Sequence, residues 1–270
     1  MKARYVDAHC HIQFDEYAQD ESAVVGRMRD AGVAGIVVGV DYESSKKAVA
    51  LADKHGHLFA SVGLHPNHAT EETFDAERFR ALATHPKVVA IGECGLDFFR
   101  PAEVTDEVKE KQKELFGQHI ALAAELDKPL IVHARPSKGS MDAYRDLIEI
   151  LKEAKRGHPN LRGDIHFFVG GVPEAQALVE LGFTVSFTAV ITFARDYDAV
   201  IKAVPLASIL SETDAPYVAP VSRRGERNDP LAVEEVAAKI AEIRDEDPEL
   251  VRKTLVENAE RMFALGVEAC

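Results

Sequence analysis

Near the start of the chain, the stretch V-D-A-H-C-H places one carboxylate and two imidazoles, Asp7, His9 and His11, at alternate positions. In an extended segment, side chains two residues apart point the same way, so His9 and His11 can present their rings to one ion. Asp7 lies just behind them, where a carboxylate can orient a ligand ring or a neighbouring backbone group. This spacing predicts the beginning of a divalent-metal site, with a chance pattern as the alternative.

Four further residues of metal-binding type occur later in the chain. Glu93 lies in A-I-G-E-C-G-L-D, behind apolar residues and between two glycines, and a carboxylate can bridge two cations. His133 ends the run P-L-I-V-H, His166 lies in D-I-H-F-F, and Asp214 lies in S-E-T-D-A-P-Y. Taken singly, each also fits an ordinary surface carboxylate, a hydrogen-bonded core histidine or an aspartate that begins a turn.

Short β-branched runs alternate with longer amphipathic segments throughout the sequence. Most of the short runs are apolar at every position, which is typical of strands buried on both faces of a sheet. The predicted strands are R-Y-V-D (4–7), G-I-V-V-G-V (35–40), L-F-A-S-V-G (58–63), V-V-A-I-G (88–92), P-L-I-V-H (129–133), D-I-H-F-F (164–168), F-T-V-S-F (183–187) and A-S-I-L-S (207–211).

Helical patterns fill the intervals between these strands. The clearest is 106–127, where apolar residues recur every three or four positions before K-P ends the pattern. The other predicted helices lie near 21–31, 44–55, 75–84, 140–155, 173–181, 195–204, 230–244 and 248–265.

The count of eight strands, each followed by a helix, predicts an α/β protein built as a single (β/α)8 TIM barrel. No linker or change of composition divides the sequence, so one domain over 1–270 is expected. An open, doubly wound sheet is the alternative. That fold favours a Gly-rich phosphate-binding turn after the first strand, and this chain has D-A-H-C-H there.

In a barrel of this kind, chemistry collects where the strands end. The predicted strand ends carry the six ligand-type residues: His9 and His11 after the first strand, Glu93 after the fourth, His133 at the end of the fifth, His166 on the sixth and Asp214 after the eighth. Their convergence on one rim makes a joint metal site the better interpretation than six separate accidents.

Bulk properties narrow the possible partners and compartment. The net charge of −13 argues against a broad basic surface for nucleic acid or anionic lipid, although bound cations can reverse the field inside a site. The longest apolar stretch, at 32–40, is far too short to span a membrane. Together with three cysteines and no signal-peptide pattern, it predicts a cytoplasmic protein without a membrane partner. Cys10 and Cys94 are expected to be small packing residues.

The ordered motifs resemble the TatD family of metal-dependent hydrolases, within the amidohydrolase-like barrel superfamily. The resemblance extends nearly from end to end and includes D-A-H-C-H (7–11), V-G-L-H-P (62–66), I-G-E-C-G-L-D (91–97), I-V-H-A-R (131–135), S-E-T-D-A-P-Y (211–217) and R-R-G-E-R-N-D-P (223–230). In strand six, H-F-F-V-G-G stands where such families commonly have H-C-F-S-G, so the pocket wall beside that ligand differs.

The resemblance implies two divalent ions, of zinc, magnesium or manganese. His9, His11 and Asp214 would hold one ion, His133 and His166 the second, and Glu93 would bridge them. Family members are described chiefly as DNases that cleave phosphodiesters, often from the 3′ end. The implied substrate is therefore DNA, with single strands or 3′ ends favoured, and no obligate protein partner is expected.

Within that mechanism, Asp214 and Glu93 are the catalytic candidates, and Asp214 would also accept a proton from the attacking water. Phosphate contacts are expected from His65 and Arg135, and from the basic cluster Arg223, Arg224 and Arg227. Asp7, Glu212 and Asp97 are candidates for orienting the ligands. A loop histidine, surface arginines and a solvated loop are the alternative interpretations of the phosphate-binding candidates.

Two rival functions remain open from the sequence. An amidohydrolase acting on an amide, lactone or cyclic imide often bridges its metals with a carboxylated lysine on strand four, but Glu93 occupies that position and Lys128 lies at the opposite end of the next strand. A non-catalytic binding protein on a decayed barrel is the other, and the presence of all six ligand-type residues argues against it.

Overall fold

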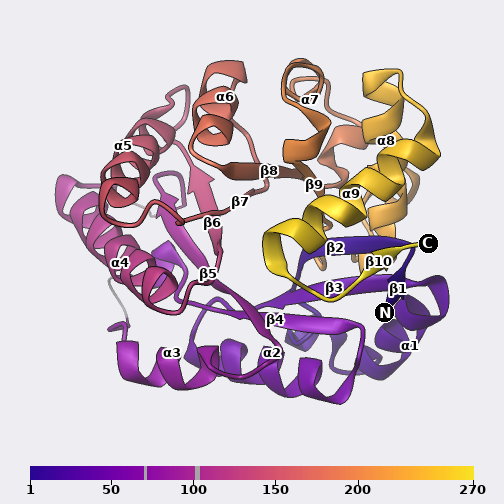
Figure 1. Cartoon of the computed structure of the whole chain (residues 1–270), viewed down its shortest axis with the longest axis horizontal. Coiled ribbons are helices and arrows are strands. Elements are labelled where there is room, and N and C mark those ends of the chain that lie inside the picture. Colours follow the sequence, from indigo (N-terminus) through magenta and orange to yellow (C-terminus); the bar gives the residue numbers. More distant parts are fainter. Residues whose placement is uncertain (70–71, 101–103) are drawn as a thin grey trace.

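The computed structural model describes residues 1–69, 72–100 and 104–270, and its centre is a nearly closed ring of eight parallel strands (Figure 1). The strands pair with their neighbours in sequence order. They are β2 (Tyr5–Cys10), β3 (Val33–Val38), β4 (Leu58–Val62), β5 (Val88–Asp97), β6 (Leu130–Arg135), β7 (Gly163–His166), β8 (Phe183–Phe187) and β9 (Ile209–Ser211). The predicted TIM-barrel architecture is confirmed.

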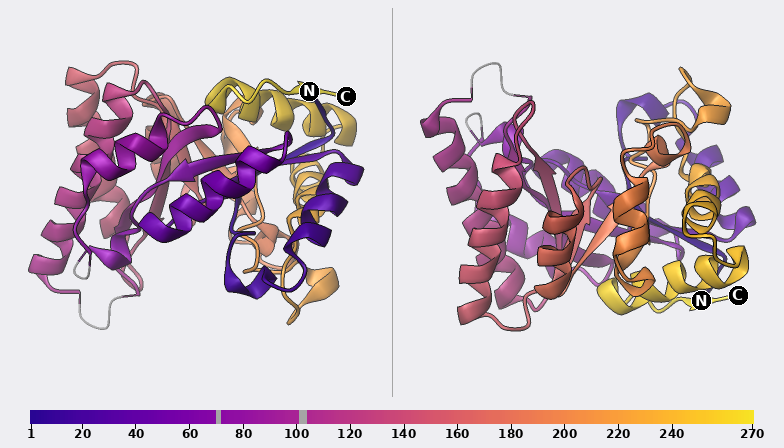
Figure 2. Two further views of the ribbon diagram at one scale, coloured as in Figure 1. Left: turned by 90° about the horizontal axis from the view of Figure 1, so that it is seen from below. Right: turned by 90° about the horizontal axis from the view of Figure 1, so that it is seen from above.

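The helices surround the ring of strands on its outside (Figure 2). They are α1 (Glu21–Ala31), α2 (Tyr42–Lys54), α3 (Ala76–Ala83), α4 (Asp106–Glu125), α5 (Asp142–Gly157), α6 (Val172–Glu180), α7 (Asp198–Ala203), α8 (Val233–Arg244) and α9 (Pro248–Phe263). Short 3-10 turns lie at Asp15–Tyr17, Pro66–His68, Ala189–Thr192, Leu206–Ser208, Val221–Arg223 and Pro230–Ala232. Among the described residues, none of these helices has the length and apolar character needed to cross a membrane.

Three strands run further than the sequence indicated, and all three carry site residues. β6 continues to Arg135, so His133 lies inside the strand and not at its end. β2 continues to Cys10, so His9 lies on the strand and not after it. β5 continues to Asp97, so Glu93 lies inside the strand and the predicted position after it was wrong. A Cβ atom at Gly95 would collide with the His133 carbonyl oxygen, so glycine lets β5 approach β6 closely. A register shift between Ile91 and Cys94 accompanies this approach.

The chain termini form a small sheet that the sequence patterns did not predict. β1 (Lys2–Ala3) and β10 (Glu268–Ala269) pair in parallel and bring the two ends side by side (Figures 1 and 2). Each strand contains two residues, which is too short for any periodicity to register. The predicted helix from 230 also differs, because Pro230–Ala232 forms a 3-10 turn before α8 begins.

The ring is joined between its first and last strands by a few specific bonds. The amide N of Asp214 donates to the His9 carbonyl oxygen at 2.9 Å, and the His11 amide donates to Ala215 at 2.8 Å. The carboxylate of Asp7 accepts hydrogen bonds from the Thr213 amide at 2.9 Å and from Thr213 Oγ1 at 2.6 Å. Asp7 therefore fixes the backbone at Thr213, and with it the position of the Asp214 segment relative to the His9 segment.

We expect Asp7→Ala to lower the free energy of unfolding by about 2 to 4 kcal/mol, because it leaves buried donors of Thr213 without an acceptor. Asp7→Asn is the matched control, since its amide can still accept from the backbone and donate to the hydroxyl. Urea unfolding in the presence of a chelator measures both variants without any contribution from metal. Equal stability of Asp7→Ala and the unaltered protein would show that the hydrogen bonds between Asp7 and Thr213 contribute nothing to the free energy of unfolding.

Candidate metal centre

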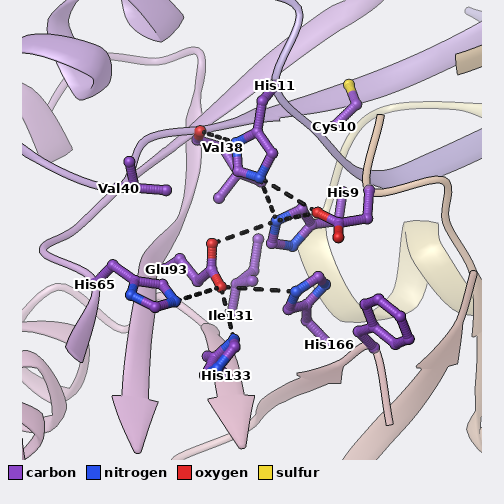
Figure 3. A network of polar contacts seen from close by, with 12 residues as sticks. His9, Cys10, His11, Val38, Val40, His65, Glu93, Ile131, His133 and His166 are labelled. Atoms are coloured by element: carbon purple, nitrogen blue, oxygen red, sulfur yellow. Dashed lines mark hydrogen bonds and ion pairs between the residues drawn. The ribbon is translucent and has the colours of Figure 1, made fainter. Parts of the chain in front are cut away.

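Glu93 lies at the middle of the buried site, with its two carboxylate oxygens directed at different histidines (Figure 3). Its Oε2 is 3.5 Å from His9 Nε2. Its Oε1 is 3.1 Å from His133 Nδ1 and 3.6 Å from His166 Nε2. His65 Nε2 also lies 3.3 Å from Oε1. The carboxylate thus connects donors from β2, β6 and β7 with the loop that follows β4.

A second set of donors lies on the β2 side of the site. His11 Nε2 is 3.1 Å from His9 Nε2 and 3.4 Å from Asp214 Oδ1. His9 Nε2 is 3.9 Å from the same Asp214 oxygen. The structure therefore brings together all six residues that the sequence singled out as ligands, although His9 and Asp214 are more than two hundred positions apart.

Hydrogen bonds on the outer side of three rings fix which nitrogen faces the site. His11 Nδ1 bonds to the Val38 carbonyl oxygen at 2.8 Å, and His166 Nδ1 to the Glu212 carboxylate at 3.1 Å. His133 Nε2 bonds to Asp97 Oδ2 at 3.2 Å. Because these oxygens accept hydrogen bonds, the outer nitrogens carry protons, and the inner nitrogens are the ones that would ligate a metal once they are free of protons.

The donor set fits a divalent cation. Four groups of three buried donor atoms lie within 4.8 Å of one another, and they are His9–His166–Asp214, His9–His11–Glu93, His65–Asp97–His133 and Glu93–His133–His166. Imidazole combined with carboxylate suits zinc, manganese and similar ions, while an all-oxygen set would favour calcium or magnesium. These groups are positioned to bind metal.

The two acidic groups of the site are held as carboxylates. Burial alone raises the pKa of Glu93, but the imidazoles of His65, His133 and His9 outweigh it and hold the pKa well below its usual range. Burial likewise acts to raise the pKa of Asp214, and the hydrogen bond from His11 with the nearby His166 and His9 lowers it overall. Both groups therefore enter metal binding already ionised.

The histidines divide into two electrostatic classes. Burial lowers the pKa of His166, but the charges of Glu212, Glu93 and Asp214 reverse this and raise it to about 10. The pKa of His133 is raised as well, since Asp97 and Glu93 outweigh its burial. For His9 and His65, burial dominates and lowers the pKa, to about 4 in the case of His65.

The site opens into a cavity of about 500 Å³, which we call the central cavity. Its walls include His11, Glu93, His133, His166 and Asp214, together with the predicted phosphate-binding residues His65 and Arg135. Asn67 and Arg100 also line it, and sequence reasoning missed both. Arg100 lies three residues beyond Asp97 and 3.9 Å from its carboxylate, and no spacing signal pointed to it.

The basic cluster near 223–227 lies away from the central cavity. Arg227 forms an ion pair with Asp20 at 2.6 Å, and Arg223 lies 3.8 Å from a carboxylate oxygen of Glu235. Arg224 stacks over the ring of Phe193, with its guanidinium carbon 3.9 Å from the ring centroid. None of the three arginines is among the cavity-lining residues, so their position gives no support to the predicted phosphate contacts.

The predicted orienting residues contact different parts of the site. Glu212 bonds to the His166 ring, to the Phe167 amide at 2.7 Å and to Ser186 Oγ at 2.9 Å, so its position is itself fixed. Asp97 bonds to the His133 ring, whereas Asp7 bonds to backbone and to Thr213.

The cysteines that flank ligand residues face away from the donors. Cys10 Sγ contacts the Ile36 carbonyl oxygen and Cys94 Sγ that of Ile131, each at 3.5 Å. Burial raises the pKa of both thiols well above the usual range. Their surroundings are those of packing residues.

Comparison with known proteins agrees with this geometry. The sequence pattern of TatD related DNases matches residues 6–264, and the chain belongs to this family. It is 35% identical over 264 residues to the uncharacterized metal-dependent hydrolase YabD of Bacillus subtilis, covering 96% of this chain and 99% of that protein. The family assignment makes the chain a metal-dependent hydrolase, as the motifs implied.

Two further similarities cover nearly all of the chain. It is 34% identical over 260 residues to the 3′-5′ ssDNA/RNA exonuclease TatD of Yersinia pseudotuberculosis, covering 93% of this chain and 95% of that protein. The crystal structure of YjjV, a TatD homologue from Escherichia coli, superposes with a TM-score of 0.87 at 31% identity, covering 98% of this chain and 99% of that chain.

Lys128, the lysine considered for a carboxylated bridge, is far from the donors. Its Nζ bonds to the carbonyl oxygen of Val88, at the first residue of β5 and thus at the opposite end of that strand from the site. Glu93, and not a lysine, lies among the donor atoms. This arrangement disfavours the lysine-bridged type of amidohydrolase site.

The raised pKa values of His133 and His166 predict that metal binding releases protons. With a pKa of about 10, the His166 ring is protonated at neutral pH without metal, and the raised pKa of His133 acts in the same direction. A ligating ring must lose the proton on its inner nitrogen, so metal affinity rises with pH. We expect roughly tenfold tighter binding per pH unit for each proton released. The release should persist at about pH 8, where an ordinary histidine, with a pKa near 6.5, is already neutral.

Calorimetry of zinc or manganese binding in buffers of different ionisation enthalpy counts the protons released. Glu212→Gln is the control, since removal of its charge lowers the pKa of His166 and reduces the release at about pH 8. Metal binding without any proton release between about pH 6 and about pH 8 would contradict the assignment of His133 and His166 as ligands.

Proposed function

We propose that this protein is a divalent-metal-dependent exonuclease that removes nucleotides from the 3′ ends of DNA single strands. The observation that carries the proposal is the orientation of Glu93, whose two oxygens face separate groups of buried donors. The exonuclease named among its relatives supports the same substrate class. We treat residues 1–270 as one functional unit that acts in the cytoplasm without an obligate protein partner.

The proposed ligand assignment follows the distances. His9, His11 and Asp214 would hold one ion, His133 and His166 would hold the second, and Glu93 would be shared, consistent with its contacts on both sides. When bound, two such ions neutralise charge on the phosphodiester and lower the pKa of an attacking water.

Asp214 is the proposed proton acceptor. Its Oδ1 faces His11 and His9, and its carboxyl group lines the central cavity, where the second oxygen can take the proton of the attacking water. Its lowered pKa keeps it ionised and ready to accept at neutral pH. The pKa of Glu93 is lowered as well, so its carboxylate remains ionised and can contact both groups of ligands at once.

His65 is proposed to donate a hydrogen bond to the substrate phosphate and not to bind metal. Its Nδ1 accepts the Asn67 amide hydrogen at 3.1 Å, so the ring proton is on Nε2, which lies 3.3 Å from Glu93 Oε1 in the wall of the central cavity. A pKa of about 4 keeps the ring neutral. Arg135, on the cavity wall, supplies the cationic contact to the same phosphate.

An assay on end-labelled oligonucleotides tests the proposal directly. Protein stripped of metal and reloaded with manganese or zinc should shorten a 5′-labelled single strand stepwise from its 3′ end. A panel of small amides and lactones, offered under the same conditions, should remain intact. Cleavage of the panel with no shortening of any strand would favour the amidohydrolase alternative.

Two variants connect that activity to the site. Glu93→Gln and Asp214→Asn keep the side-chain volume, but each removes a negative charge proposed to bind metal. Turnover should therefore fall by roughly a thousandfold or more. Thermal unfolding in chelator should remain close to that of the unaltered protein. Near-normal rates at saturating metal, in either variant, would exclude the proposed roles.

A further inference from the structure

A second, open depression lies beside the central cavity, and we call it the side groove. It is lined by Phe99, Arg135, Lys138, Met141, Arg145 and Val169 among others, with a volume of about 780 Å³. Arg135 and Val169 line both the side groove and the central cavity, so the two adjoin at these residues. The groove is formed mainly by the loop between β6 and α5, and Phe99 lies beside that loop.

The side groove is basic in a protein whose net charge is −13. It contains the side chains of Arg135, Lys138 and Arg145, and no carboxylate lies among its described lining residues. None of the three cations forms an ion pair with a carboxylate of the described residues, whereas Arg227 and Arg80 are both paired. Their charge is therefore available to a polyanion.

The loop that carries these cations is held in place by its own hydrogen bonds. Asp142 Oδ1 accepts the Ser137 amide at 2.9 Å, and Oδ2 accepts Ser137 Oγ at 2.8 Å and Lys109 Nζ at 3.0 Å. The Ser140 amide donates to the Ser137 carbonyl oxygen at 2.9 Å. Binding along this loop would consequently require little ordering of backbone.

An aromatic ring in the side groove lies against Arg135, which lines both the side groove and the central cavity. Phe99 is 47% exposed, which is unusual for so large an apolar side chain here. The Arg135 guanidinium carbon lies 4.3 Å from its ring centroid, so one face is covered by a cation. A partly exposed ring beside unpaired cations is the combination that holds stacked bases and phosphates of single strands.

We propose that the side groove binds the nucleotides on the 5′ side of the cleaved one, with a base stacked on Phe99 and phosphates against Lys138 and Arg145. This inference rests on the proposed function and names its substrate more narrowly. The enzyme acts on strands of several nucleotides and binds them more tightly than dinucleotides, because only a longer strand extends from the central cavity into the side groove.

The test compares two charge-matched double variants. Lys138→Ala/Arg145→Ala removes two positive charges from the side groove, and Lys54→Ala/Lys202→Ala removes two from exposed positions outside both the groove and the central cavity. The probes are a single-stranded DNA of twelve nucleotides and a DNA dinucleotide. Steady-state turnover with manganese and fluorescence anisotropy of the labelled twelve-mer are measured at several salt concentrations.

For Lys138→Ala/Arg145→Ala, we expect KM for the twelve-mer to rise about tenfold and the salt dependence of its binding to weaken by roughly one phosphate contact per charge removed. Its KM for the dinucleotide and the control's values should stay within about twofold of the unaltered enzyme. Phe99→Ala should weaken twelve-mer binding similarly, without altering the salt dependence, because stacking carries no counterion release.

Two results would overturn the side-groove assignment. One is equal twelve-mer binding by the groove variant and the control variant. The other is an equal loss on the dinucleotide, which would indicate an effect on the central cavity. If the unaltered protein binds the twelve-mer through these cations but cleaves no strand with any metal, the proposed function fails while the groove assignment stands.

Discussion

A buried carboxylate among imidazoles is the constraint on which the rest of this molecule depends. Glu93 is 3% exposed and ionised, so the cost of removing its charge from water has to be met by close partners. Those partners come from the first, fifth and sixth strands of the ring and from the loop after the third. The barrel must close, in register, for the carboxylate to be compensated at all.

The geometry of β5 and the seam between β2 and β9 meet that requirement in different ways. Gly95 allows β5 to lie against β6, where it pairs with His133 and places Glu93 within reach of that ring. At the seam, Asp7 and Thr213 fix the segments that carry His9 and Asp214. Outer contacts from Val38, Asp97 and Glu212 then fix which nitrogen of each ring faces the inside of the site.

Much of this could be predicted from the sequence, because strands buried on both faces give continuous apolar runs and barrel chemistry collects at strand ends. The strand count, the barrel and the convergence of six ligand-type residues all followed from those two regularities. Arg100, Asn67 and the terminal strand pair did not, since their positions depend on packing that leaves no periodic signal. The cluster Arg223–Arg227 attracted attention through charge density alone, and its ion pairs with Asp20 and Glu235 are contacts distant in sequence.

The most direct test of the central claim is a crystal structure of the protein grown with manganese, with anomalous scattering used to locate the ions. Two anomalous peaks should lie on either side of the Glu93 carboxylate, one bound by His9, His11 and Asp214 and the other by His133 and His166. A map with no peak between these side chains at saturating manganese, or with both ions bound elsewhere on the protein, would contradict the account.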